Sequence, residues 1–133
     1  MSRNVIRTDR APAPVGPYNQ AIAAVGELIF VAGQIPLDPV TNDMVAPDDI
    51  AAQTDRVLKN IEAILTAAGA TFQDIVKTTV FLTDLGDFAA MNQVYSQYFD
   101  SENAPARACV EVSKLPKGAR VEIECIAVVD RTA

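Results

Sequence analysis

Two β-type runs near the C-terminus carry alternating polar side chains of the kinds that bind ligands or take part in catalysis. Arg107 and Cys109 are two positions apart in the first run, and Glu122 and Glu124 are two apart in the second. Alternate residues of a strand share a face, so Arg107 and Cys109 would stand roughly 7 Å apart, a spacing that could span a small carboxylate. The planar fork of Arg107 matches a carboxylate.

The two runs, Pro105–Val112 and Val121–Val129, are separated by a break that contains Pro116 and Gly118. This pattern predicts a β-hairpin with its turn near Pro116, which cannot donate a ladder hydrogen bond. If the apolar residues of both runs face one side of the sheet, the four polar side chains share the other side.

The same residues allow a plainer interpretation. Exposed charges are the rule on protein surfaces, so the polar face could simply be solvated. Arg107 could be a structural residue that forms a salt bridge to Glu111 or Glu124. The cysteine among the charges and the shortage of other chemistry in the chain favour a functional face.

The absence of histidine narrows the chemistry that the chain can perform. None of the 133 residues is a histidine, which excludes a Ser-His-Asp triad, a Cys-His dyad and the commonest metal ligand. Cys109 and Cys125 are the only cysteines, and two cysteines without histidine argue against a zinc site. We therefore expect no metal, and proton transfer must use carboxylates, Cys, Tyr, Lys, backbone groups or water.

Charge and hydropathy argue against nucleic acid and membrane as partners. The net charge is −6 and the pI is about 4.5, a balance that repels phosphate backbones. Residues 1–7 lack the apolar core of a signal peptide, and no apolar run approaches the ~20 residues of a membrane helix. Strand parity puts Cys109 and Cys125 on opposite faces of the sheet, which predicts reduced thiols in a cytoplasmic protein.

The hydrophobic pattern predicts the element order β-β-β-α-β-α-β-β. The expected elements are a short run at 5–7, an antiparallel pair at 21–25 and 27–32, helices at about 47–68 and 87–100, a strand at 75–83, and the two C-terminal runs. Strands in groups rather than in strict alternation indicate an α+β fold, a mixed β-sheet with two helices on one face.

Both faces of the 75–83 strand are substantially apolar. One face carries Val76, Thr78, Val80 and Leu82, and the other carries Ile75, Lys77, Thr79 and Phe81. We therefore expect helices to cover one face of the sheet and another subunit to cover the other.

Several motifs, in register over nearly the whole chain, resemble those of the RidA family (reactive intermediate deaminase A, also called YjgF). They are Gly16-Pro17-Tyr18-Asn19-Gln20-Ala21, Gly33-Gln34-Ile35-Pro36, Ala67-Ala68-Gly69, the runs Asp74–Leu82 and Asp84–Asn92, Pro105–Val112, Leu115-Pro116-Lys117 and Val121–Glu124. The resemblance implies one domain over residues 1–133 with a chorismate-mutase-like fold, assembled as a homotrimer with sites at the subunit interfaces.

The resemblance also implies a reaction and the residues that perform it. The family hydrolyses 2-imino acids such as 2-iminobutanoate and 2-iminopropanoate to 2-keto acids and ammonia, without a cofactor. It implies that the catalytic residues are Arg107, which would bind the carboxylate, Glu122, which would activate water, and Cys109, which would line the pocket. The implied substrate-binding residues, besides Arg107, are Tyr18, Gly33 and Asn92.

Two other functions stay open on the same scaffold. One is a small-molecule binding or sensing protein without a reaction, and the other is an endoribonuclease or translation inhibitor. The acidic charge and the lack of histidine count against an action on RNA. Ala104 and Ala32 stand where many family members have Phe and Ser, and we expect both to alter the shape of the pocket.

Overall fold

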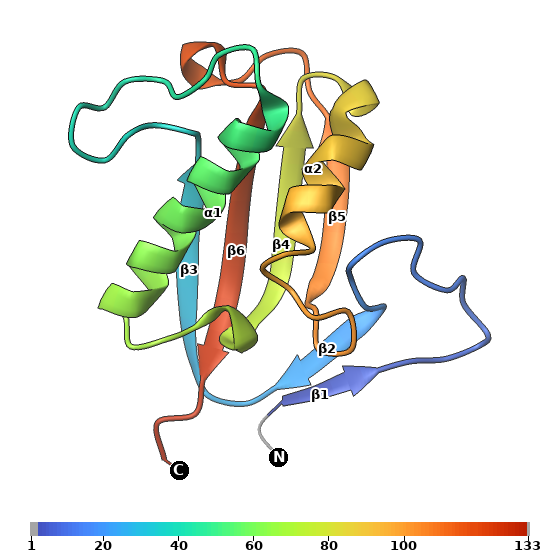
Figure 1. Ribbon diagram of the computed structural model, residues 1–133. Helices are drawn as coiled ribbons and strands as arrows, with labels where there is room; N and C mark the ends of the chain where they lie inside the picture. Colours follow the sequence, from blue (N-terminus) through green and yellow to red (C-terminus); the bar gives the residue numbers. More distant parts are fainter. Residues whose placement is uncertain (1–2, 133) are drawn as a thin grey trace.

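The computed structural model describes residues 3–132, with a four-stranded mixed sheet, a separate two-stranded hairpin and two α-helices (Figure 1). The elements in chain order are β1 (Arg3–Ile6), β2 (Ala21–Ala24), β3 (Glu27–Gln34), α1 (Ile50–Ala67), β4 (Ile75–Leu82), α2 (Phe88–Tyr95), β5 (Ala106–Glu111) and β6 (Val121–Val129), with short 3₁₀ turns at Phe72–Asp74, Leu85–Asp87 and Pro116–Gly118. The predicted order of strands and helices is confirmed. No helix within residues 3–132 is long and apolar enough to span a membrane.

Local sequence signals explain where α1 begins and ends. Asp49 is the N-cap, and its side chain accepts a hydrogen bond from the backbone N–H of Ala52. Gly69 follows the C-cap with a φ of +72°, a conformation that glycine adopts without steric cost. The helix is therefore three residues shorter at its start than predicted, because Pro47 and Asp48 precede the cap.

Both helices pack on one face of the sheet, as predicted (Figure 1). The strands present their alternate apolar residues to this face, and these meet the apolar side of α1 and the buried residues of α2. The fully buried side chains at this layer include Val57, Leu58, Ile61, Val80, Leu82, Met91, Tyr95, Val121 and Ile123.

The opposite face of the sheet, which we call the open face, is apolar and uncovered in the single chain. Leu28 and Phe30 on β3 are 56% and 70% exposed, and Val110 on β5 is 42% exposed. Isolated exposed apolar residues are ordinary, but several on one sheet face are typical of a surface that binds a partner.

The strand pairing corrects two predicted hairpins. The sheet order is β3-β6-β4-β5, so β5 and β6 are not neighbours, because β4 lies between them, antiparallel to β6 and parallel to β5. The predicted pair at 21–25 and 27–32 is also wrong, since β2 pairs with β1 and β3 pairs with β6. In both places adjacent apolar runs form their ladders with distant strands instead of with each other.

The predicted faces of β4 need one change. A register irregularity lies between Ile75 and Lys77, and it turns Ile75 into the core, where it is fully buried. Beyond it the predicted alternation holds, with Thr78, Val80 and Leu82 buried. The bulge has no signature in the sequence, because Ile75 and Val76 are good strand formers and no glycine or proline marks it.

Candidate functional site

Arg107 lies on the edge strand β5, beside α2, with its guanidinium among three aromatic rings. Its central carbon lies 4.8 Å from the ring centroid of Tyr95, 5.2 Å from that of Tyr18 and 5.6 Å from that of Phe88. Each distance is within the range of a cation–π interaction. The rings come from α2 and from the N-terminal segment, so two other parts of the chain converge on the cation of β5.

Asn92 of α2 fixes one end of the guanidinium. The Nη1 of Arg107 donates a hydrogen bond of 2.6 Å to the Oδ1 of Asn92. Gly16 closes the other side, because a Cβ there would lie 3.1 Å from Nη2 of Arg107. A side chain at position 16 would therefore press on the guanidinium.

The N-terminal motif reaches β5 because its asparagine is anchored beside that strand. Asn19 is buried, and its Nδ2 donates to the carbonyls of Ser101 and Ala104 at 3.0 and 2.8 Å. The hydroxyl of Tyr18, the residue before Asn19, accepts a hydrogen bond from the backbone N–H of Val15. These bonds hold the ring of Tyr18 against Arg107.

The charge of Arg107 has no carboxylate partner among residues 3–132. The ion pairs in this part of the chain join Asp55 to Lys59, Asp87 to Arg120 and Glu27 to Arg131. The proposed structural salt bridge to Glu111 or Glu124 is therefore wrong, and the Glu111 carboxylate instead accepts from the N–H of Leu85. An unpaired, half-buried cation is a favourable site for an anionic ligand.

A small pocket of about 180 Å³ opens onto this cation. It is lined by Val15, Tyr18, Phe88, Arg107 and Cys109. Burial raises the pKa of the Cys109 thiol, and the nearby Arg107 only partly opposes that shift. The thiol is therefore protonated at neutral pH and is a poor nucleophile.

Glu122 and Glu124 do not share the face of Arg107 and Cys109, contrary to our prediction. Val80 of β4 is the register partner of both Cys109 and Ile123, so Cys109 faces the helices while Glu122 faces the open side. The prediction failed because it assumed that β5 and β6 pair directly, whereas β4 separates them.

Gly33 and Glu122 lie against each other. A Cβ built on Gly33 would stand 2.9 Å from the carboxyl carbon of Glu122, so the glycine leaves room for this side chain. Within one chain, the predicted site residues thus form two groups. Arg107, Asn92, Tyr18 and Cys109 lie together beside α2, and Gly33 and Glu122 lie together at the other side of the sheet.

The two cysteines face the same side of the sheet, which corrects the predicted parity. Cys109 pairs with Val80 and Cys125 with Thr78, on opposite sides of β4. Both are free thiols. Cys125 is buried in the core, and that burial raises its pKa to about 12.

The two alanines expected to shape the pocket occupy other places. Ala104 is buried in the hydrophobic core, and Ala32 is exposed on β3 next to Gly33. Sequence reasoning also missed Phe88, Tyr95 and Gly16 as neighbours of Arg107. Both aromatic residues had the spacing of a helix packing face, and only their distance to Arg107 in three dimensions distinguishes them.

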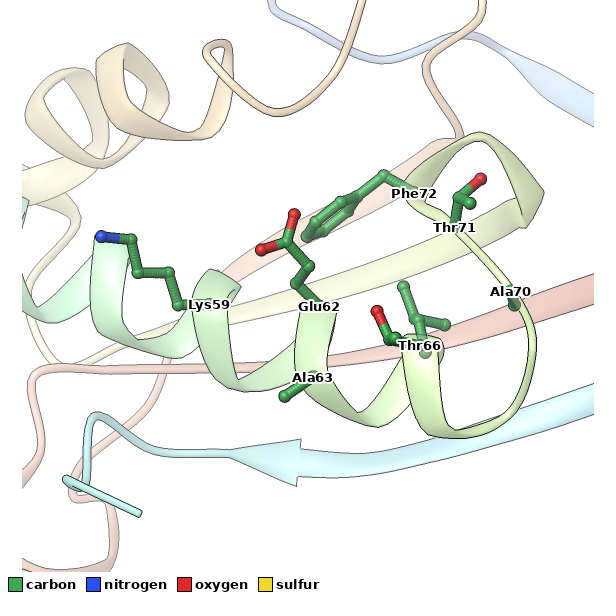
Figure 2. Close-up of a pocket in the computed structure, with 8 residues that line it drawn as sticks. Lys59, Glu62, Ala63, Thr66, Ala70, Thr71 and Phe72 are labelled. Atoms are coloured by element: carbon green, nitrogen blue, oxygen red, sulfur yellow. The ribbon is translucent and has the colours of Figure 1, made fainter. Parts of the chain in front are cut away.

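Two of the larger hollows contain none of the residues around Arg107. One, of about 440 Å³, lies between the C-terminal half of α1 and the turn after it, where Lys59, Glu62 and Thr66 rise from the helix beside Thr71 and Phe72 (Figure 2). The other, of about 410 Å³, includes Gly33 and lies between the end of β3 and α1. No cluster of three or more potential metal ligands occurs in the described part of the chain.

Comparison with known proteins gives consistent matches over the whole chain. Residues 8–129 match the family model described as endoribonuclease L-PSP. A RutC family protein of Synechocystis is 55% identical over 96% of this chain and 98% of its own length. TdcF of Escherichia coli K12, named as a candidate reactive intermediate deaminase, is 47% identical over 95% of this chain and 97% of its own.

Solved structures also match this chain over nearly its whole length. The crystal structure of E. coli TdcF with bound serine superposes with a TM-score of 0.72 at 46% identity, covering 96% of this chain and 99% of that one. At this identity and coverage the likeness extends to the family as well as to the fold.

Proposed function

The chain belongs to the family described as endoribonuclease L-PSP, the RidA or YjgF family, and on that premise we propose that it is a cofactor-independent deaminase of reactive imines and enamines. Its substrates would be small 2-imino acids such as 2-iminobutanoate and 2-iminopropanoate. The products would be the 2-keto acid and ammonia.

The observation that carries this proposal is the unpaired guanidinium of Arg107. It is held by an amide oxygen and three aromatic rings rather than by a carboxylate. Its remaining N–H groups can bind a substrate carboxylate through two parallel, charge-assisted hydrogen bonds. The strongest handle on a small 2-imino acid is its carboxylate, and the pocket beside Arg107 is of matching size.

The separation of Glu122 from Arg107 within one chain supports a site between subunits. Arg107 is on the edge strand β5, and Glu122 is on the apolar open face. A neighbouring subunit whose open face abuts the β5 edge would bring its Glu122 and Gly33 to the pocket of Arg107. Three copies related by a threefold axis would bury each open face and form three such sites.

Hydrolysis at this site needs only water and a carboxylate. Glu122 takes a proton from water as the water oxygen bonds to the carbon of the protonated imine, which gives a neutral carbinolamine. The protonated carboxyl then gives this proton to the amine. As the C–N bond breaks, the carbinolamine hydroxyl passes its proton to the Glu122 carboxylate, the 2-keto acid and ammonia leave, and the carboxyl releases its proton to solvent. Asn92 and Tyr18 hold Arg107 in place, and Cys109 lines the pocket.

The direct test follows keto-acid release when the protein is added to an amino-acid dehydratase reaction, which generates the imine in solution. We expect faster release in proportion to the protein added. An unchanged rate at every protein concentration, with the imine shown to be present, would refute the deaminase assignment.

RNA cleavage is the second candidate function, because the matching family is described as endoribonuclease L-PSP. Binding of RNA through phosphate contacts should weaken steeply with salt, whereas imine hydrolysis should not. The net charge of −6 favours the deaminase.

We predict that the protein is a homotrimer with three times the subunit mass of 14.2 kDa. Phe30→Asp would place a charge on the open face and should shift the mass measured by light scattering toward that of a monomer. Val40→Asp, at an even more exposed apolar residue outside the strands, is the control and should leave the trimer intact. A monomer mass for the unaltered protein at micromolar concentration would contradict the assembly.

We predict that Cys109→Ser keeps at least about a tenth of the deaminase activity, because its thiol is protonated and only lines the pocket. A bulky thiol reagent should abolish the activity of the unaltered protein by filling the pocket. Because the thiolate reacts, labelling should speed up as pH rises toward the raised pKa. The Cys109→Ser protein is the control for Cys125, which is buried and should not be labelled. Complete inactivity of a folded, trimeric Cys109→Ser would instead indicate a chemical role for the sulfur.

A further inference from the structure

Tyr95 is a fully buried tyrosine that contacts the proposed site through its ring. Its exposed fraction is 0%, and its ring centroid lies closer to the guanidinium carbon of Arg107 than either other aromatic ring does. Its other face stacks on Phe99, with centroids 4.4 Å apart and an interplanar angle of 27°. The ring is thus packed between the core and the cation.

A second buried polar group fixes the position of this ring. The hydroxyl of Tyr95 and the Oγ1 of Thr78 form a hydrogen bond of 2.7 Å, and Thr78 is 1% exposed. Burial raises the pKa of Tyr95 to about 12, so the hydroxyl stays neutral and protonated at neutral pH. A buried hydroxyl that has one good partner resists movement, because breaking the bond leaves both groups unsatisfied.

The strand register links Thr78 to Arg107 directly. Thr78 of β4 is the register partner of Arg107 on the parallel strand β5. Arg107 and the residue that holds the ring of Tyr95 therefore lie side by side on neighbouring strands of the sheet. The guanidinium is bonded to Asn92 and lies over the ring of Tyr95.

We propose that Tyr95, held by Thr78, is a positioning residue that sets the plane of the Arg107 guanidinium for a substrate carboxylate. This inference rests on the proposed function, and it adds a residue that touches neither substrate nor water. A carboxylate clamp works only when both of its hydrogen bonds are aligned, and the ring of Tyr95 limits tilting of the fork.

Replacing the ring is the first test. Tyr95→Leu should raise KM for 2-iminobutanoate about tenfold or more with kcat changed less than about threefold, since a carboxylate clamp binds ground state and transition state alike. Tyr95→Phe keeps the ring but loses its hydrogen bond to Thr78, so its KM should rise only about threefold. Tyr98→Leu is the matched control, because Tyr98 bonds to Asp55 on α1 and does not contact Arg107; its KM should be unchanged.

A double variant keeps the proposal testable if Tyr95→Leu does not fold. Tyr95→Phe combined with Thr78→Val removes both hydroxyls and leaves no unsatisfied group, so the core should remain stable. Its KM should still rise about threefold, because the ring is no longer tethered. Thr54→Val, which removes a buried hydroxyl bonded within α1, is the control and should leave KM unchanged. An unchanged KM in the folded double variant would overturn the proposal.

The Arg107→Lys background separates positioning from general packing. An ammonium has no plane to orient, so Tyr95→Leu should change KM less than about twofold there. An equal loss in both backgrounds would show that Tyr95 acts by packing alone and would overturn the proposal.

Binding of 2-ketobutanoate, measured by titration calorimetry, separates this proposal from the proposed function. If the unaltered protein binds this carboxylate but hydrolyses no imine, the deaminase assignment fails while the effect of Tyr95→Leu on the Kd still decides the positioning role. If the protein hydrolyses the imine and the Tyr95 variants match it in KM and Kd, only the positioning role fails. If it neither binds nor hydrolyses, both fail.

Discussion

Glu122→Gln is expected to lower the kcat for 2-iminobutanoate by about two to four powers of ten, the usual contribution of a general base. Glutamine keeps the size of the side chain but cannot take a proton from water. Gly33 leaves the space that this side chain occupies, so the substitution should not disturb the strand. Rates of keto-acid release at saturating substrate provide the measurement, with light scattering to confirm the assembly.

Glu124→Gln is the matched control for this variant. Glu124 lies two positions along β6 and on the same open face, but it is exposed. It should keep nearly full activity if the loss in Glu122→Gln comes from the missing base and not from a lower charge on this face. A Glu122→Gln protein within about threefold of the unaltered enzyme would rule out the general-base role.

Mixed assemblies test whether one site uses residues of two chains. When Arg107→Ala and Glu122→Gln subunits are unfolded together and refolded, some interfaces should combine an intact Arg107 with an intact Glu122 from the other chain. We expect such mixtures to recover a measurable part of the activity that each variant lacks alone. No recovery in trimers shown to contain both chains would contradict the interface site.

The arrangement of elements was predictable from the sequence because it depends on local signals. The spacing of Val57, Leu58 and Ile61, with Gly69 after α1, specifies an amphipathic helix and its C-terminal end, although the predicted start was three residues too early. The alternation in β4 marks a strand with two apolar faces. These features predict two helices on one face of a sheet without any knowledge of strand order.

Strand order was not predictable from the residues alone, because it depends on contacts between distant segments. The run at 121–129 could pair with any apolar strand, and the short turn at Pro116–Gly118 made β5 the obvious partner. The structure instead inserts β4 between them, which moves Glu122 to the face opposite Arg107. The wrong pairing of β5 with β6 therefore placed Glu122 on the wrong face of the sheet, since each face assignment depends on the strand register.

The sequence motifs identified the candidate site residues but did not predict how these residues are arranged in space. Nothing in the sequence indicates that Tyr95, with the spacing of a core residue on α2, lies 4.8 Å from a guanidinium. Nor does the sequence show that Arg107 lacks an ion-pair partner within residues 3–132, when glutamates stand nearby in the chain. Both facts arise from the parallel pairing of β4 with β5, a contact between residues far apart in sequence.

Arg107→Ala is expected to reduce kcat/KM by about 3–5 kcal/mol, or roughly two to four powers of ten. In the proposed site, the substitution would remove two charge-assisted hydrogen bonds to the substrate carboxylate, each worth about 1.5–3 kcal/mol. It also leaves the substrate charge desolvated among aromatic rings. Initial rates of keto-acid release at low substrate concentration measure this loss directly.

Arg56→Ala is the matched control, because Arg56 is also half-buried and also donates to an asparagine side chain, at 3.2 Å. It lies on α1, away from β5, and should change kcat/KM less than about twofold if a lost Arg–Asn hydrogen bond is not itself the cause.

Arg107→Lys distinguishes a carboxylate clamp from a simple positive charge. An ammonium keeps the charge, but it lacks the planar fork that Asn92 and the aromatic rings hold in place. We therefore expect it to recover only part of the loss in Arg107→Ala. Because no carboxylate pairs with Arg107 within residues 3–132, the loss of transition-state stabilisation should exceed any loss in the free energy of unfolding. Near-complete turnover in Arg107→Lys, or inactivity of every Arg107 variant only because the trimer dissociates, would show that Arg107 does not bind the substrate carboxylate.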